Sequence, residues 1–138
     1  MMRIIVTGGR KFPSFEAPKG THWSGVHSAL EREYNRWFPI SPIDRFVVVH
    51  GGARGADAWA SDWTRYQRYA VEEVHPADWA KYGRAAGPIR NQEMVDAGAD
   101  ACFAFPVIGS VGTYDCMRRA RRAGIKTLVW DIEAGDFQ

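Results

Sequence analysis

Apolar and polar positions alternate along the chain in two patterns. Short apolar runs, most of them rich in β-branched or aromatic residues, predict five strands, at residues 3–7, 46–50, 71–75, 100–105 and 126–130. Intervening segments have apolar positions three or four residues apart and predict helices at residues 23–37, 57–70, 86–97 and 113–123. Nearly continuous apolar strands that alternate with amphipathic helices are typical of a parallel sheet covered on both faces. We therefore expect an α/β fold, a Rossmann-like three-layer αβα sandwich around a mainly parallel sheet of about five strands.

Two segments, residues 11–22 and 76–88, do not follow this alternation. Both leave the carboxyl ends of predicted strands, and the second is too long for an ordinary tight connection. Open α/β sheets bind their ligands at the carboxyl ends of the strands. The irregular segments therefore indicate a binding site at that edge of the sheet.

Length and composition narrow the class of protein. The 138 residues, 46% of them hydrophobic, predict a single domain over residues 1–138. A net charge of +2 is too small to indicate nucleic acid by itself. Cys102 and Cys116 lack CxxC spacing, so we expect neither a disulfide framework nor a metal site, and no cofactor is indicated. No apolar run approaches the roughly 18 residues of a membrane span, and the first run is too short for a signal peptide. We expect a soluble, cytoplasmic protein.

Glycine follows three of the predicted strands. The turns are Gly8-Gly9-Arg10, residues 51–57 (GGARGAD) and residues 106–113 (PVIGSVGT). Glycine lets the backbone approach a ligand closely, and a helix that begins just beyond such a turn offers unpaired amides and a positive dipole end. These features suit phosphate, although any single turn could need glycine for its geometry alone. No turn is a GxGxxG fingerprint or carries GK[ST], so neither a dinucleotide site nor a P-loop is supported.

Arginines accompany these turns. Arg10 and Arg54 lie inside the first two, and Arg84 and Arg90 lie in the long third connection. The planar guanidinium binds phosphate or carboxylate through two hydrogen bonds, while the alternative is a solvated rim. The run at residues 118–122 lies in the last turns of a predicted helix, where cations complement the dipole, and we interpret it as a solvated face.

Three stretches together resemble a known family. GGARGADAWA, HPADWAKYGRAAGPIRNQEM and the late FPxxxxxGT are similar to the YspA/YpsA-related branch of the SLOG superfamily, a Rossmann-like group that includes the LOG phosphoribohydrolases and the DNA-processing protein DprA. The resemblance spans residues 3–130 and implies a nucleotide or nucleotide-derived ligand at the carboxyl edge of the sheet. With Arg84 added from the long connection, the expected ligand-binding residues are Gly8, Gly9, Arg10, Gly51, Gly52, Arg54, Gly55, Asp57, Arg84, Arg90, Asn91, Gly109, Ser110, Gly112 and Thr113.

The chain departs from the family's enzymes at one position. LOG-type phosphoribohydrolases carry PGGxGTxxE, whose glutamate helps to cleave the N-glycosidic bond, whereas residues 106–116 read PVIGSVGTYDC. Cys116 stands where the glutamate would, and the adjacent Asp115 is the candidate replacement. The other interpretation is that Asp115 stabilises the dipole of the helix that begins there.

Several further residues keep two interpretations. Asp57 either caps a helix or accepts a hydrogen bond from ribose, and Asp78 with Trp79 either offers a carboxylate and a stacking surface or closes a turn. His50 and His75, at strand ends, either take part in the site or are structural.

Two tryptophans also allow more than one interpretation. The i, i+4 pair Trp59 and Trp63 is better suited to the core or to a subunit contact in a homodimer than to base stacking.

Three functions follow from these patterns. The first is a binding domain or sensor for a phosphorylated nucleoside or related small molecule. The second is an enzyme like a nucleoside monophosphate phosphoribohydrolase, in which Arg90 would hold phosphate or ribose and Asp115 would stabilise an oxocarbenium-like charge. The third is single-stranded DNA binding in the manner of DprA, which would require a basic groove and strong salt dependence. No membrane partner is expected.

Overall fold

The computed structural model describes residues 1–17, 21–38 and 43–138. Its main sheet has six strands in the order β5-β4-β1-β6-β7-β8. The strands are β1 (Met2–Gly8), β4 (Phe46–His50), β5 (Ala70–Val74), β6 (Ala101–Phe105), β7 (Lys126–Asp131) and β8 (Asp136–Phe137). The first five pair in parallel, and β8 pairs antiparallel with β7. The predicted parallel sheet is confirmed, with the short β8 as an addition.

The order of the parallel strands creates a crevice. From β1 the chain moves outward through β4 to β5, then crosses back to place β6 on the other side of β1 and continues to β7. The strand order therefore reverses between β1 and β6, which pair from Ile4–Ala101 to Gly8–Phe105. In doubly wound sheets the ligand crevice lies at this reversal, outside the carboxyl ends of the strands.

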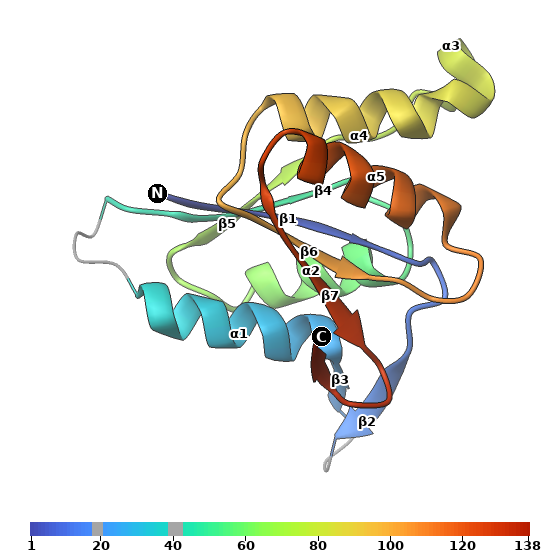
Figure 1. Ribbon diagram of the computed structural model, residues 1–138. Helices are drawn as coiled ribbons and strands as arrows, with labels where there is room; N and C mark the ends of the chain where they lie inside the picture. The colour runs from blue at the N-terminus through green and yellow to red at the C-terminus, as the bar shows by residue number, and fades with distance from the viewer. Residues whose placement is uncertain (18–20, 39–42) are drawn as a thin grey trace.

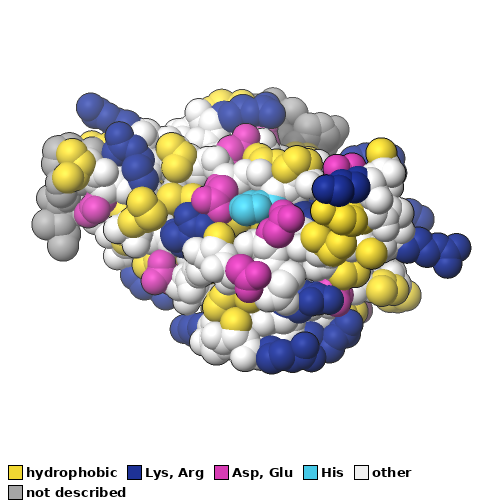
Figure 2. All heavy atoms as spheres, turned by 90° about the horizontal axis from the view of Figure 1, so that it is seen from above, with side chains coloured by type: hydrophobic (Ala, Val, Ile, Leu, Met, Phe, Trp, Pro, Cys, Tyr) yellow, Lys and Arg dark blue, Asp and Glu magenta, His cyan; other side chains and the backbone are white. Residues whose placement is uncertain are grey.

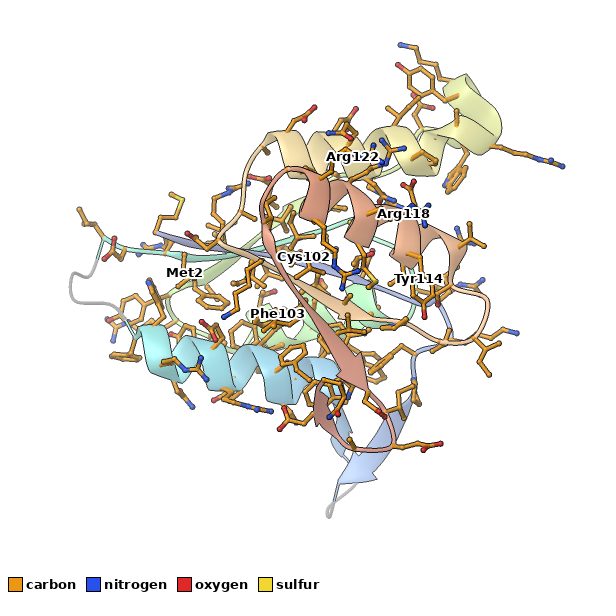
Figure 3. The ribbon with its side chains drawn as sticks, in the orientation of Figure 1. Met2, Cys102, Phe103, Tyr114, Arg118 and Arg122 are labelled. Carbon is orange, nitrogen blue, oxygen red and sulfur yellow. The ribbon has the colours of Figure 1, made fainter. Side chains whose placement is uncertain are left out.

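Helices cover both faces of the sheet (Figure 1). α1 (Gly25–Trp37) and α2 (Ala56–Thr64) lie on one face, and α4 (Ala86–Asp96) and α5 (Val111–Arg122) on the other. Side chains alternate between the two layers: the neighbours Cys102 and Phe103 point to opposite faces of β6 (Figure 3). The three-layer αβα arrangement is thus confirmed. Within the described ranges, no helix combines the length and apolar character that a bilayer span demands.

Aromatic rings fill the layer beneath α1 and α2. Tyr34, Phe46 and Trp63 pack edge to face, with ring centroids 5.4 to 5.6 Å apart. The Trp63 indole is 2% exposed, and its Nε1 donates a 2.7 Å hydrogen bond to Glu31. Trp59 packs against the same cluster and is partly buried. Trp63 is therefore a core residue, in agreement with the core interpretation drawn from the sequence.

The prediction of a helix at residues 57–70 is wrong at its carboxyl end. α2 stops at Thr64, whose hydroxyl donates to the Ser61 carbonyl at 2.7 Å, and Tyr66 is 77% exposed instead of lying on the buried face. Ala70 instead pairs with Phe46 as the first residue of β5. Strand pairing thus overrides the helical spacing of the apolar residues.

Both segments predicted to be irregular contain regular structure. β2 (Ser14–Ala17) and β3 (Thr21–Ser24) form an antiparallel pair, and the Ser24 hydroxyl caps α1 by accepting from the His27 amide. The predicted helix start at residue 23 is therefore two residues early. The second segment holds the short α3 (Trp79–Tyr82) and a 3₁₀ turn (Gly83–Ala85) before α4 begins.

An ion pair joins the central strand to the edge strand. Arg3 of β1 binds Glu73 of β5 through two hydrogen bonds of 2.8 and 3.0 Å, and His75 Nε2 lies 2.8 Å from the same carboxylate. The hydrogen bonds from Arg3, then from His75, lower the pKa of Glu73 to about 2. Because the carboxylate is ionised more readily in the folded chain, it contributes stability above its ordinary pKa of 4.5 and loses this contribution as pH falls toward about 2.

Glu73→Gln tests this acid dependence. The ion pair is partly exposed, so we expect it to contribute only about 1 kcal/mol to the free energy of unfolding. Urea unfolding at pH 6 and at pH 2.5 should show a smaller loss of stability on acidification for this variant than for the wild type. Glu93→Gln is the matched control, because Glu93 is more exposed and lies 3.9 Å from His75. Equal pH dependence in all three proteins would contradict the assignment.

Candidate functional site

A pocket of about 620 Å³ opens at the carboxyl edge of the sheet, at the reversal between β1 and β6. The loops after β1 and β6, the first turns of α4 and α5, and α3 enclose it. It brings together most of the residues expected from the sequence: Gly8, Gly9, Arg10, Asp57, Arg84, Arg90, Asn91, Gly109, Ser110, Gly112, Thr113 and Asp115. The other four, Gly51, Gly52, Arg54 and Gly55, do not line it.

The GGARGAD loop uses many of its polar groups internally. The buried Asp57 carboxylate accepts hydrogen bonds from the amides of Gly51 at 3.1 Å and Ala53 at 3.2 Å. Burial raises the pKa of Asp57, while His50, the two amides and Arg90 oppose that rise. Gly55 occupies the amino-terminal cap of α2. Asp57 therefore binds amides of the preceding loop and does not cap the helix. One face of Asp57 still lines the pocket.

Close packing explains two of the glycines. Gly55 has φ of +75°, and a Cβ there would collide with the backbone of Gly9 and Arg10. A Cβ on Gly8 would collide with Ala56 and with the Phe105 carbonyl. The Gly9 carbonyl in turn accepts from the Ala56 amide, so the first loop caps α2. These glycines serve the contact between loops.

Both strand-end histidines make structural contacts. His50 Nδ1 accepts from the Gly52 amide at 3.0 Å, so its Nε2 carries the proton and donates to Glu72 at 2.8 Å. This hydrogen bond is the main reason that the pKa of Glu72 is lowered. His75 pairs with Glu73, and neither histidine lines the pocket.

Arg90 joins three parts of the site. Its Nη1 donates to the carbonyl of Gly51 at 2.9 Å and to that of His75 at 3.4 Å, and its Nε donates to Asn91 Oδ1 at 3.0 Å. Asn91 is 3% exposed and donates through Nδ2 to the Gly112 carbonyl and to Asp115. The pair thus connects the ends of β4 and β5 to the first turn of α5.

Asp115 is held as a carboxylate beside the pocket. Its Oδ2 accepts from Asn91 Nδ2 at 3.0 Å and from Arg119 Nε at 2.9 Å. Burial acts to raise the pKa of Asp115, but the hydrogen bonds from Arg119 and Asn91 outweigh it, so the pKa lies below its ordinary value. Cys116 is fully buried against Cys102 and cannot reach a ligand. At the departure from the LOG pattern, only Asp115 faces the pocket.

Arg118 was interpreted from the sequence as part of a solvated face, but it lines the pocket. Asp115 accounts for this placement, because Arg118 Nη2 lies 3.6 Å from its Oδ1. Along α5, Arg118 lies between Tyr114 and Arg122, and Arg122 is near the end away from the pocket (Figure 3). The arginine run therefore contributes Arg118 to the lining of the pocket and Arg119 to the hydrogen bonds that hold Asp115.

Basic charge dominates the pocket. Five basic and two acidic side chains line it: Arg10, Lys11, Arg84, Arg90 and Arg118, with Asp57 and Asp115. The whole chain carries a net charge of only +2. On the surface of the molecule where α4 lies, acidic and basic side chains are otherwise interspersed (Figure 2). The pocket thus concentrates positive charge and favours an anionic ligand.

The first turn of α5 provides backbone donors to this pocket. Ser110 precedes the helix, and its hydroxyl accepts from the Val107 amide at 2.9 Å, which orders the preceding turn. First-turn amides of a helix have no partner within the helix and point toward anions. Gly112 lies in this turn, and a Cβ built on it meets no atom within 4 Å.

Ile108 and Val111, which the sequence did not single out, line the pocket, and so does Trp79, for which the sequence left a stacking surface and a turn as alternatives. The three form an apolar rim, with 106%, 79% and 50% exposure respectively. The neighbouring Asp78 caps α3 by accepting from the Lys81 amide at 3.1 Å. That cap holds the short helix, and Trp79 with it, at the pocket.

Comparisons with known proteins found one family and one similar phage protein. Residues 2–82 match the family model of the YspA, cpYpsA-related SLOG family. The Gene 61 protein of Mycobacterium phage D29 is 44% identical over 132 residues, which cover 93% of this chain and 95% of the phage protein. No solved structure matches the chain.

Gly51→Ala tests the role of Arg90 in the frame of the site. A Cβ on Gly51 would overlap the Arg90 guanidinium and displace it from its carbonyl partners. Loss of hydrogen bonds to a charged donor should lower the free energy of unfolding by about 2 kcal/mol, measured by urea denaturation. Gly112→Ala is the matched control, because the added methyl meets open space. Equal stability of both variants would contradict this role.

Proposed function

Because the chain belongs to the YspA, cpYpsA-related SLOG family, we propose that its pocket binds a phosphorylated nucleoside or a nucleotide-derived small molecule. The phosphate lies against the first turn of α5, and the basic side chains around the pocket neutralise it. Binding of this kind suits a sensor or a binding domain. The volume of about 620 Å³ is within the range of small-molecule sites in proteins.

Gly112 carries this proposal. Its backbone has no positive φ, and a side chain there would meet no protein atom within 4 Å. Glycine in a helix costs stability relative to alanine, roughly 0.5–1 kcal/mol at an interior position. Neither conformation nor packing requires glycine at this position, whereas close approach of a ligand to the helix amides does. Gly8 and Gly55 differ, because close packing against neighbouring atoms accounts for each of them.

Charge supports the same ligand class. Arg10, Lys11, Arg84 and Arg118 line the pocket in addition to the engaged Arg90. Guanidinium groups bind phosphate oxygens through paired hydrogen bonds. The two acidic residues are both held by internal donors, Asp57 by loop amides and Asp115 by Asn91 and Arg119. Their negative charge is therefore partly offset before a ligand arrives.

Gly112→Ala separates ligand binding from folding. We expect thermal stability equal to or above that of the wild type, because alanine favours the helix. Affinity should fall at least about tenfold, the effect of losing about 1.4 kcal/mol of binding free energy. The measurement is a thermal-shift and calorimetric screen with nucleoside mono-, di- and triphosphates, cyclic nucleotides, ADP-ribose and a short single-stranded oligonucleotide.

Tyr114→Ala is the control for this screen, since Tyr114 lies in the same helix but does not line the pocket. It should bind as the wild type does. Unchanged affinity in Gly112→Ala would contradict the placement of the phosphate. Binding of the oligonucleotide alone, with strong salt dependence, would overturn the proposal in favour of single-stranded DNA.

Asp115 favours a second candidate, hydrolysis of an N-glycosidic bond in the bound nucleotide. A carboxylate that stays ionised at neutral pH can stabilise an oxocarbenium-like transition state. Asp115 meets this condition and lines the pocket. The Nη1 and Nε atoms of Arg90 are engaged with protein partners, so in this reaction Arg90 positions the loops around the substrate.

Asp115→Asn tests the hydrolase. If the protein releases a base from a nucleoside monophosphate, the variant should lose at least about a hundredfold in rate, because the neutral amide cannot stabilise the developing charge. Release of free base is followed by chromatography. Asp96→Asn, at the far end of α4, serves as the control. Undiminished activity of Asp115→Asn would remove this residue from the mechanism. Nucleotide binding without base release in the wild type would rule out the hydrolase and support the binding domain.

A further inference from the structure

A half-exposed tryptophan, Trp79, stands at the mouth of the pocket. Trp79 lies in α3, lines the pocket and is 50% exposed, unlike Trp63 and Trp130, which are at most 5% exposed. A tryptophan half exposed to water contributes less burial energy than a core tryptophan. Its position therefore calls for an explanation other than the core.

The ring is held in place from its far edge. A Cβ on Gly87 would lie 3.3 Å from Trp79 Cη2, so glycine in the first turn of α4 leaves room for the indole. The Asp78 carboxylate fixes the start of α3 by accepting from the Lys81 amide. A ring that is seated in this way loses little conformational freedom when a ligand packs on it.

A cation already lies over this ring. The Arg10 guanidinium carbon is 5.9 Å from the centroid of Trp79. Arg10 also belongs to the loop after β1 and lines the same pocket. The ring face is thus turned toward a basic residue that lines the same pocket.

Apolar side chains from the opposite loop complete the rim. Ile108 and Val111 border the pocket from the α5 side, whereas Trp79 borders it from the α4 side. Figure 2 shows hydrophobic side chains gathered at the end of the molecule where α3 lies. An aromatic ring and aliphatic side chains at the rim, together with the basic side chains that line the same pocket, match a ligand that is planar at one end and anionic at the other.

We infer that Trp79 stacks on the base of the ligand, so that the pocket selects nucleoside phosphates over sugar phosphates that have no base. The inference rests on the proposed function. It adds a contact with the base, which the phosphate site at α5 does not recognise. Stacking is tolerant of base identity because every base has a π face. The larger purines should bind more tightly than pyrimidines.

The test compares one nucleotide with its base-free counterpart. The probes are AMP, GMP, CMP and UMP, with ribose 5-phosphate as the ligand without a base. Trp79→Ala should weaken nucleotide binding by about tenfold to a hundredfold, the range found for loss of base–aromatic stacking, and leave ribose 5-phosphate unaffected. Trp79→Phe should retain most of the affinity. Tyr82→Ala, the exposed aromatic of the same helix that does not line the pocket, should bind as the wild type does.

The outcomes separate the two proposals. Equal nucleotide affinity in Trp79→Ala and wild type would overturn the stacking and leave the phosphate site in place. An equal loss for nucleotides and for ribose 5-phosphate would also overturn it, because the ring would then act on the phosphate end. A wild type that binds none of the five probes would overturn the proposed function and the inference with it.

A second measurement needs no variant. In wild-type protein, transferred nuclear Overhauser effects should connect base protons of the bound nucleotide to a tryptophan ring. Contacts only between ribose protons and the protein would overturn the inference. Sedimentation of wild type and Trp79→Ala covers another role: a dimer that dissociates in the variant, with nucleotide affinity unchanged, would assign Trp79 to a contact between copies of the chain instead.

Discussion

The hydrogen bonds of the Arg90 guanidinium hold the site together. They reach the carbonyls of Gly51 and His75, at the ends of β4 and β5, from a side chain that α4 supplies. Through Asn91 the same network reaches Gly112 and Asp115 in α5. A charged donor that is taken from water must keep its partners, because a buried group left unpaired costs more than the bond contributes. The loops around the pocket are therefore positioned together rather than one by one.

This network divides the pocket into a frame and a binding wall. The GGARGAD loop belongs to the frame: Asp57 binds its amides, His50 binds Gly52, and Gly55 packs on the loop after β1. The wall consists of the first turn of α5 and the basic side chains, where Gly112 faces open space. A glycine-rich loop can thus shape a pocket indirectly, since it holds in place the backbone that lines it.

The sequence predicted the layers of the fold more accurately than the ends of its elements and the residues around the pocket. Apolar periodicity located all five parallel strands and four helices, since burial of whole faces dominates the free energy of such elements. It placed the end of α2 wrongly at residue 70, because pairing of Ala70 with Phe46 depends on a strand distant in the chain. It also left the role of Trp79 open and assigned Arg118 to a solvated face. Their positions depend on an Asp78 cap and on an ion pair with Asp115, and periodicity carries neither.

By itself, the amino-acid sequence determined the fold class, the family and the edge of the sheet at which the pocket lies, because these depend on local patterns of burial and on short motifs. Only the tertiary structure decided which motif residues line the pocket. Gly51 and Gly112 look alike in sequence, yet one lies against Arg90 and the other borders an open pocket. That difference depends on which elements the folded chain brings within a few ångströms of each glycine, and contacts between distant segments exist only once the sheet and its helices have packed.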